Sequence, residues 1–392
     1  MTPDQYRQSV LAQSKNAAKN VAFNAGIVFN PQTATTQDYL TYPILETEAV
    51  ITDDGAKPVM LKRPAIGQVC VIDWLNITFK ASTFDNWVTE GISEMARESF
   101  IIKEFEELLL KILGFGIQKQ NDHGLNFYQR SYRLEHNAGE ICIGCQNDTI
   151  MLMLSGIGCT YAPNGWEGEL YTWLFTIAKD PKITRIDLAH DDLFGDYTDL
   201  SWFARQDDKG GFACGGYRKP NIEMRGNWKR PNGKGRSLYI GTRRSSKYCR
   251  IYEKGKQLGD PNSPWLRAEV EFKSKSIYIP LHVLVNPSPF FLAAYPCFHI
   301  FDPQNQTNQQ KFERIEQQHF ITFADAVHIT RHQFGRYLHC FRTEFAKHNL
   351  TDKQLLDLLT DLDNKAYPDR LDPLSIPQDL PNSLGELKNG KN

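Results

Sequence analysis

The stretch LRAEVEFK, residues 266–273, alternates charged and apolar side chains along its whole length. The charged positions fall two residues apart and are Arg267, Glu269, Glu271 and Lys273. Successive side chains of a β-strand point to opposite faces. The stretch therefore predicts a strand with one polar face and one buried face.

Two earlier stretches repeat this pattern: TRIDLAHD, residues 184–191, and KYCRIYEK, residues 247–254. Their polar positions are Arg185, Asp187, Asp191, Tyr248, Arg250, Tyr252 and Lys254. A sheet that pairs the three strands brings Asp187, Glu269 and Tyr252 onto one polar face. The exposed face of any antiparallel sheet also alternates in charge, so the pattern alone leaves a purely structural face open.

The elements before these strands predict the fold class. Residues 68–79, QVCVIDWLNITF, predict a buried strand, and Ser93 to Gly114 predict a helix that packs on it. Strand-like runs follow at 126–134, 139–144 and 150–155, the last closing in a turn-rich SGIGCT, and 168–178 predict a second helix. This order predicts an α+β fold with a mainly antiparallel sheet, packed helices and two sheet-forming halves.

The chain divides into four predicted parts: an N-terminal appendage (1–65) without sustained periodicity, a main domain (66–300), a helical segment (301–365) and a loose tail (366–392). The helical segment carries an apolar stripe from Phe323 to Phe345, followed by a capping sequence at Thr351 and Gln354. These helices either cover the sheet or form a DNA-reading helix-turn-helix, and the apolar stripe favours packing.

The net charge of −1 over 392 residues hides a basic segment at 217–256. This segment holds thirteen Lys and Arg residues against Glu223 and Glu253, a balance of +11, and aromatic residues interleave with the charges. Such a density indicates a nucleic-acid contact, although a solvated basic loop stays open. No apolar run is long enough for a membrane span and no secretory signal is visible, so we expect no membrane partner and a cytoplasmic protein.

The eight cysteines show no disulfide framework. Only Cys142 and Cys145 form a CxxC pair, which is more typical of buried thiols here than of a zinc or redox site.

Carboxylates on a common face are suited to Mg²⁺ or Mn²⁺, which can polarise a phosphate. A tyrosine hydroxyl beside them can attack phosphorus and become esterified. An ordinary tyrosine has a pKa near 10, so a neighbouring cation such as Lys254 is needed to favour the phenolate.

Read in order, five blocks resemble the replication initiation factor family (Rep_trans type) of filamentous phages and of small rolling-circle plasmids of Gram-positive bacteria. They are IDWLNITF (72–79), LSGIGC (154–159), TRIDLAHDD (184–192), LYIGTRRSSKYCRIYEKGKQ (238–257) and LRAEVEFK (266–273). The fourth block is the most specific. The blocks cover about half of the chain, from roughly 70 to 275, and leave the N-terminal appendage and the C-terminal helices outside.

The resemblance implies a diverged form of the rolling-circle nickase fold, with residues 66–300 as the catalytic domain. It implies Tyr252 as the nucleophile, with Tyr248 as its rival, and Lys254 and Arg267 as assisting catalytic residues. It implies Asp187 and Glu269 as ligands of Mg²⁺ or Mn²⁺. The residues that it places at DNA phosphates, together with basic neighbours, are Arg236, Gly241, Arg243, Arg244, Ser245, Lys247 and Arg250. No His-hydrophobic-His triplet, the metal motif of many other nickases, occurs in the chain.

The expected activity is nicking of one strand at a double-strand origin, leaving a 5′-phosphotyrosine link and a free 3′ hydroxyl. The partners implied are origin DNA, a host helicase and a host polymerase, in the bacterial cytoplasm. A homodimer is plausible for a protein that must cut again at termination, and the oligomeric state stays open. Two alternatives stay open: a non-catalytic DNA-binding regulator of replication or transcription on the same fold, and a metal-dependent phosphoesterase that uses water.

Overall fold

The computed structural model describes residues 43–87, 93–144, 147–213, 219–313 and 323–360, with short pieces at 376–377 and 379. Contacts divide the chain into two compact units, Met1–Ile315 and Glu316–Asn392. The four-part division predicted from the sequence stays a prediction, and the two units are described separately below.

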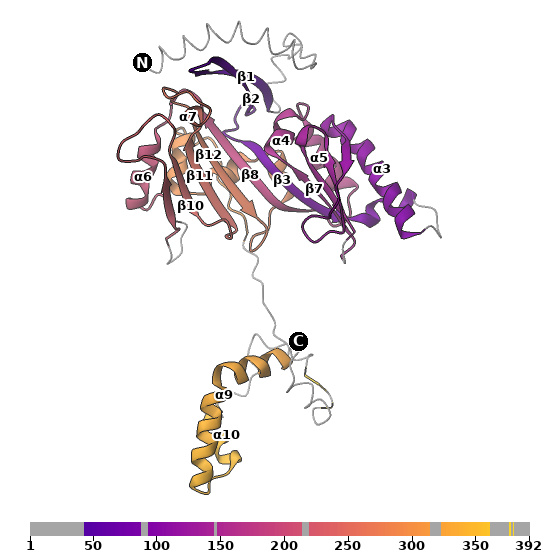
Figure 1. Cartoon of the computed structure of the whole chain (residues 1–392), viewed down its shortest axis with the longest axis vertical. Coiled ribbons are helices and arrows are strands. Elements are labelled where there is room, and N and C mark those ends of the chain that lie inside the picture. Colours follow the sequence, from indigo (N-terminus) through magenta and orange to yellow (C-terminus); the bar gives the residue numbers. More distant parts are fainter. Residues whose placement is uncertain are drawn as a thin grey trace. The chain divides into compact units, whose positions relative to one another are not determined.

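A ten-stranded antiparallel sheet forms the framework of the first unit among its described residues. The strand order is β4-β5-β6-β7-β3-β8-β12-β11-β10-β9, and Figure 1 shows β10 to β7 side by side. The strands are β3 (Val71–Lys80), β4 (Ile117–Gln120), β5 (Arg130–Leu134), β6 (Gly139–Ile143), β7 (Thr149–Leu154), β8 (Lys182–Asp192), β9 (Ile222–Arg225), β10 (Ser237–Gly241), β11 (Lys247–Glu253) and β12 (Leu266–Lys273). The predicted α+β class is confirmed, and the two halves of the sheet meet where β3 pairs with β8.

The longer helices of this unit cover the apolar face of the sheet. Helix α3 (Glu94–Leu113) begins after Ser93, whose side chain accepts from Ala96 N, and ends at the left-handed Gly114, as predicted. Phe79 of β3 packs edge-on against Phe105 of α3 and Trp173 of α5 (Trp166–Thr176), with ring centroids 5.3 and 5.1 Å away. These contacts join sheet and helices in one core.

Two local predictions were wrong. The SGIGCT turn is a short helix, α4 (Gly156–Tyr161), because Ser155 caps it by accepting from Gly158 N. The strand predicted over 126–134 is confined to β5, because Asn126 and Phe127 have positive φ angles that end an extended backbone.

The stretch 1–65 contains a hairpin, β1 (Ile44–Thr52) and β2 (Gly55–Arg63), although its sequence lacks a sustained periodicity. Val50 and Leu61 of the hairpin pack with Leu193 and Trp265, which lie at the ends of β8 and β12. The hairpin is thus anchored near one end of the central strands.

The remaining short elements connect the strands and longer helices along the chain, and among them α7 begins directly after β11. They are α6 (Leu200–Asp208), α7 (Lys254–Gln257), α8 (Ser288–Leu292) and the 3₁₀ turns η1 (Ala81–Trp87), η2 (Glu135–Asn137), η3 (Leu281–Leu284) and η4 (Pro296–Phe301). Gly255 lets α7 approach the loop before β12, because an added Cβ would lie 1.9 Å from the Ser263 hydroxyl.

The second unit consists, where described, mainly of α9 (Phe323–Lys347) and α10 (Asp352–Leu359). The predicted capping box at Thr351 and Gln354 is present. Phe334 and Phe341 of the predicted stripe are exposed, so whether these helices cover the sheet or read DNA stays a prediction. No helix in the described ranges is both long and apolar enough to cross a lipid bilayer.

Candidate active site on the polar face of the sheet

The three alternating stretches are neighbours, as predicted. Strand β12 lies between β8 and β11. Its Arg267 faces Tyr252 on one side and Asp191 on the other, and Glu269 faces Arg250. Directly paired residues of an antiparallel sheet share a face, so the predicted polar face exists.

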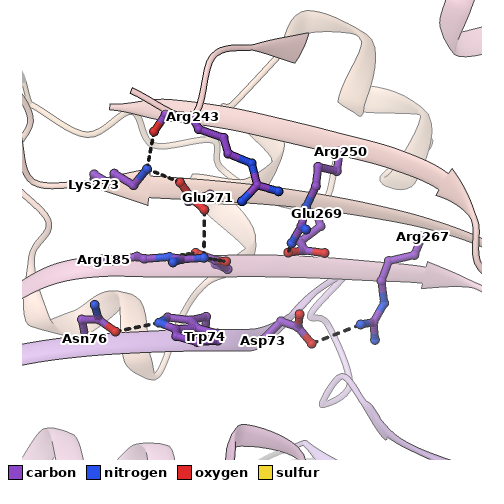
Figure 2. A network of polar contacts seen from close by, with 11 residues as sticks. Asp73, Trp74, Asn76, Arg185, Arg243, Arg250, Arg267, Glu269, Glu271 and Lys273 are labelled. Atoms are coloured by element: carbon purple, nitrogen blue, oxygen red, sulfur yellow. Dashed lines mark hydrogen bonds and ion pairs between the residues drawn. The ribbon is translucent and has the colours of Figure 1, made fainter. Parts of the chain in front are cut away.

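Asp187 lies in a cluster of charged side chains at one side of this face. The Arg185 guanidinium donates to both Asp187 oxygens, at 2.8 and 2.6 Å, and also binds Glu271 at 2.8 Å. Glu271 in turn contacts Lys273, whose ammonium reaches the Arg243 carbonyl, as Figure 2 shows. Burial raises the pKa of Asp187 to about 7, with Arg185 acting against burial.

Arg267 connects three strands through its guanidinium. Its Nε and Nη2 donate to the two oxygens of Asp191 at 2.8 and 2.7 Å, and Nη1 donates to Asp73 at 3.1 Å. The Trp265 indole donates to Asp191 at 2.7 Å. Burial alone would raise the pKa of Asp191, but Arg267 and Trp265 stabilise its charge and hold that pKa below its ordinary value. Asp73 and Arg267 face one another in Figure 2.

Glu269 occupies the middle of the face and is bonded to Arg250. Burial raises the pKa of Glu269, and the negative charge of Asp73 raises it further, while Arg250 and Arg267 lower it. Asp73 and Glu269 are therefore close enough to repel one another, and Asp73 is a site residue that the sequence did not single out.

Tyr252 is half-buried next to this group, and none of the described residues hydrogen-bonds its hydroxyl. Burial raises the pKa of Tyr252, and the carboxylates of Glu269, Asp73 and Asp191 add to the rise, while Arg267 lowers it. The Lys254 ammonium lies 5.7 Å from the Tyr252 ring centroid. Burial and the positive Arg267 lower the pKa of Lys254. The charges of Arg267, Asp73, Asp191 and Glu269 thus act on both Tyr252 and Lys254.

Tyr248, the rival nucleophile, has different neighbours. Its ring is buried, stacks against Tyr239 and lies beneath Arg243, at 6.0 and 5.8 Å. Burial raises the pKa of Tyr248, and Arg243, which hydrogen-bonds its side chain, lowers it. Besides burial, the groups that act most on the pKa of Tyr248 are Arg243, Tyr239 and Arg250, whereas Arg267, Glu269, Asp73 and Asp191 act on that of Tyr252.

The predicted ligand pair Asp187 and Glu269 does not form a ready metal site in this arrangement. Both oxygens of Asp187 are bonded to Arg185, and Glu269 is bonded to Arg250. Within the described ranges, no group of three or more His, Cys, Asp and Glu side chains is arranged to hold a metal ion. The metal-ligand roles of Asp187 and Glu269 stay predictions. To bind Mg²⁺ or Mn²⁺, Asp187 would have to release Arg185, and Glu269 would have to release Arg250.

Some of the predicted DNA-contact residues already bind other residues of the protein, whereas others are exposed to solvent. Arg236 is bonded to Glu253 and lies over Trp228, and Lys247 donates to the Ala294 carbonyl. Arg243 and Arg244 are exposed in the β10–β11 turn, next to Gly241, which has a positive φ, and Ser245. Their roles at DNA stay predictions.

Cys142 is a buried thiol, whereas Cys145, Tyr217 and Arg218 lie outside the described residues.

The described fold and site define an α+β protein with a tyrosine, several carboxylates and arginines on one sheet face. Residues 181–353 match the model of the family described as replication initiation factor, and this range contains Asp187, Tyr252 and Glu269. The resemblance to this family is therefore confirmed for the three motif blocks from residue 184 to residue 273. The match also extends over α9, which the motifs had left outside, and it does not include the blocks at 72–79 and 154–159.

One matching solved structure is that of the rolling circle replication initiator protein from Geobacillus stearothermophilus. It is 20% identical with a TM-score of 0.41, and the alignment covers 58% of this chain and 84% of that chain. No curated protein matches the chain.

Proposed function

We propose that this protein is a rolling-circle replication initiator that nicks one strand of double-stranded origin DNA through Tyr252. One observation carries the proposal. Tyr252 lies on the polar face opposite Arg267, in the electrostatic range of Glu269 and Asp73, within the stretch that matches the replication initiation factor model. A tyrosine hydroxyl can attack a phosphodiester and become esterified when neighbouring groups position it and favour loss of its proton.

The reaction is a transesterification. The Tyr252 oxygen bonds to phosphorus while the bond from phosphorus to the 3′ oxygen breaks, which leaves a 5′-phosphotyrosine and a free 3′ hydroxyl. The phenol loses one proton and the departing 3′ oxygen gains one, so the overall reaction conserves protons. Because the pKa of Tyr252 is raised, the resting side chain is a neutral phenol.

Positive charge near the Tyr252 phenol has to stabilise the phenolate that forms when the oxygen attacks phosphorus. The Lys254 ammonium beside the ring favours the phenolate, and Arg267 lowers the pKa of Tyr252 in the same sense. Arg267 uses three of its five N–H groups for Asp191 and Asp73, which leaves two that can approach a phosphate. Mg²⁺ or Mn²⁺ stays a part of the proposal that rests on the sequence, and its contribution would be to polarise the scissile phosphate.

A nicking assay tests the proposal with matched tyrosine variants. The substrate is a supercoiled plasmid carrying the DNA that flanks the protein's own coding region, incubated with Mg²⁺ or Mn²⁺. We expect open circles and a protein-DNA adduct from the wild type and from Tyr248→Phe, and neither from Tyr252→Phe. An adduct formed by Tyr252→Phe contradicts the assignment of the nucleophile.

The same assay separates the alternatives. Open circles without an adduct would identify a phosphoesterase that uses water. Salt-sensitive DNA binding without open circles would identify a non-catalytic regulator. A host helicase and a host polymerase belong to the proposal as the partners that replication from a nick requires, in the cytoplasm where the bacterial DNA lies. A homodimer belongs to it because a protein that ends replication has to cut a second time.

A further inference from the structure

Two arginines and two tyrosines form a continuous stack on the outer part of the sheet. Tyr239 of β10 and Tyr248 of β11 stack with their ring centroids 6.0 Å apart and an interplanar angle of 20°. The Arg225 guanidinium of β9 lies over the Tyr239 ring, 4.8 Å from its centroid, and Arg243 lies over the Tyr248 ring at 5.8 Å. We call Arg225, Tyr239, Tyr248 and Arg243 the arginine-tyrosine column.

The column lies on the same sheet face as Tyr252. In the register of β10 with β11, Ser237 faces Tyr252, Tyr239 faces Arg250, and Gly241 faces Tyr248. Tyr248 and Tyr252 are four residues apart on one strand, which is about 13 Å. A DNA strand held at Tyr252 can therefore reach the column along β11.

Among the described residues, the outer end of the column is exposed at Arg225. Strand β9 is the last strand of the described sheet, and Tyr239 is half-buried while Tyr248 behind it is buried. Arg225 is exposed, and its ion pair with Glu223 joins two side chains that are 62% and 50% exposed. Exposed ion pairs hold their partners weakly, so Arg225 can leave the Tyr239 ring.

We propose that the arginine-tyrosine column is a stacking platform for single-stranded DNA beside the scissile phosphate. A base takes the face of Tyr239 that Arg225 covers, Tyr248 supports the ring from behind, and Arg225 and Arg243 turn to the phosphates. Aromatic rings accept any base, because every base has a flat face, and arginines supply the charge that a strand needs. The inference rests on the proposed function, since it is the nick that frees a single strand.

The test is a binding titration that does not depend on nicking. A fluorescently labelled oligothymidine of about 20 nucleotides, which cannot form a duplex, is titrated with the full chain and followed by anisotropy. We expect Tyr239→Ala to weaken binding about tenfold and Tyr239→Phe, which keeps the ring, to stay within about twofold of the wild type. Phe175→Ala is the matched control, because it removes an exposed ring that stacks on Tyr171 in helix α5.

Wild-type affinity in Tyr239→Ala overturns the inference. A loss in Tyr239→Ala that Phe175→Ala reproduces also overturns it, as does an equal loss of affinity for a duplex of the same length. The nicking result is separate. If the wild type forms no covalent adduct but binds the oligothymidine through Tyr239, the proposed function fails and the stacking platform stands as a single-strand site.

Discussion

Arg267 allows the strongest quantitative prediction for the site. Its side chain is 13% exposed and that of Asp191 is 7% exposed, and two hydrogen bonds of 2.8 and 2.7 Å join them. Arg267→Gln keeps much of the volume but leaves Asp191 as a buried charge without its cation. Removing one partner of a buried ion pair costs about 3–5 kcal/mol, and we expect a loss of that size in the free energy of unfolding.

Urea unfolding followed by tryptophan fluorescence measures this loss. All seven tryptophans lie at or before Trp265, so the signal reports on the unit up to Ile315. Arg97→Gln is the matched control, because Arg97 also binds two carboxylates, Asp85 and Asp148, whose side chains are exposed. Exposed pairs contribute about 0–1 kcal/mol, so the control should change little.

A double-mutant cycle isolates the pair itself. Asp191→Asn and Arg267→Gln should each destabilise the protein, and together they should cost less than the sum by about 1–3 kcal/mol, because each removes the same interaction. If Arg267→Gln costs less than about 1 kcal/mol, like Arg97→Gln, the buried cation does not hold the strands β3, β8 and β12 together, and the reasoning is refuted.

Three further predictions follow from particular groups. The pKa of Asp187, about 7, lies above its ordinary value of 3.8, so this group should make the free energy of unfolding fall as the pH rises from about 4 to about 7. Asp187→Asn should remove that pH dependence in urea unfolding. The same pH profile for the variant and the wild type would contradict the prediction. Chelation by EDTA should abolish the adduct, with Mn²⁺ or Mg²⁺ restoring it, and an adduct formed in EDTA would disprove the ion requirement. Gly255→Ala should lower the urea midpoint of unfolding, because its new methyl group would collide with the Ser263 hydroxyl. Gly168→Ala is the control: it lies in α5 with open space around it and should raise the free energy of unfolding by about 0.5–1 kcal/mol. Equal effects of the two substitutions would show that the close contact between Gly255 and Ser263 is unimportant.

The alternation of charged and apolar residues was sufficient to predict the polar face, because it depends only on the two-residue period of a strand. It could not predict the register. Glu271, and not Glu269, lies opposite Asp187, and Arg185 binds both Asp187 and Glu271. Strand pairing is set by tertiary packing and turn geometry, which the local pattern does not contain. The sequence therefore predicted that residues of β8, β11 and β12 share a polar face, but it predicted neither their partners nor Asp73.

Asp73 was missed for a local reason. In VIDWLNITF it has the same parity as Leu75, Ile77 and Phe79, which face the helices, so alternation assigns it to the apolar side. The register of β3 with β8 shifts between Ile72 and Trp74, and Asp73 is the unpaired residue of this bulge. The bulge turns its carboxylate toward Arg267, where it adds a charge that reaches Glu269 and Tyr252. A polar residue out of phase in an otherwise regular strand was thus the available signal, because burying a carboxylate among Leu and Phe side chains without a partner is too costly to be stable.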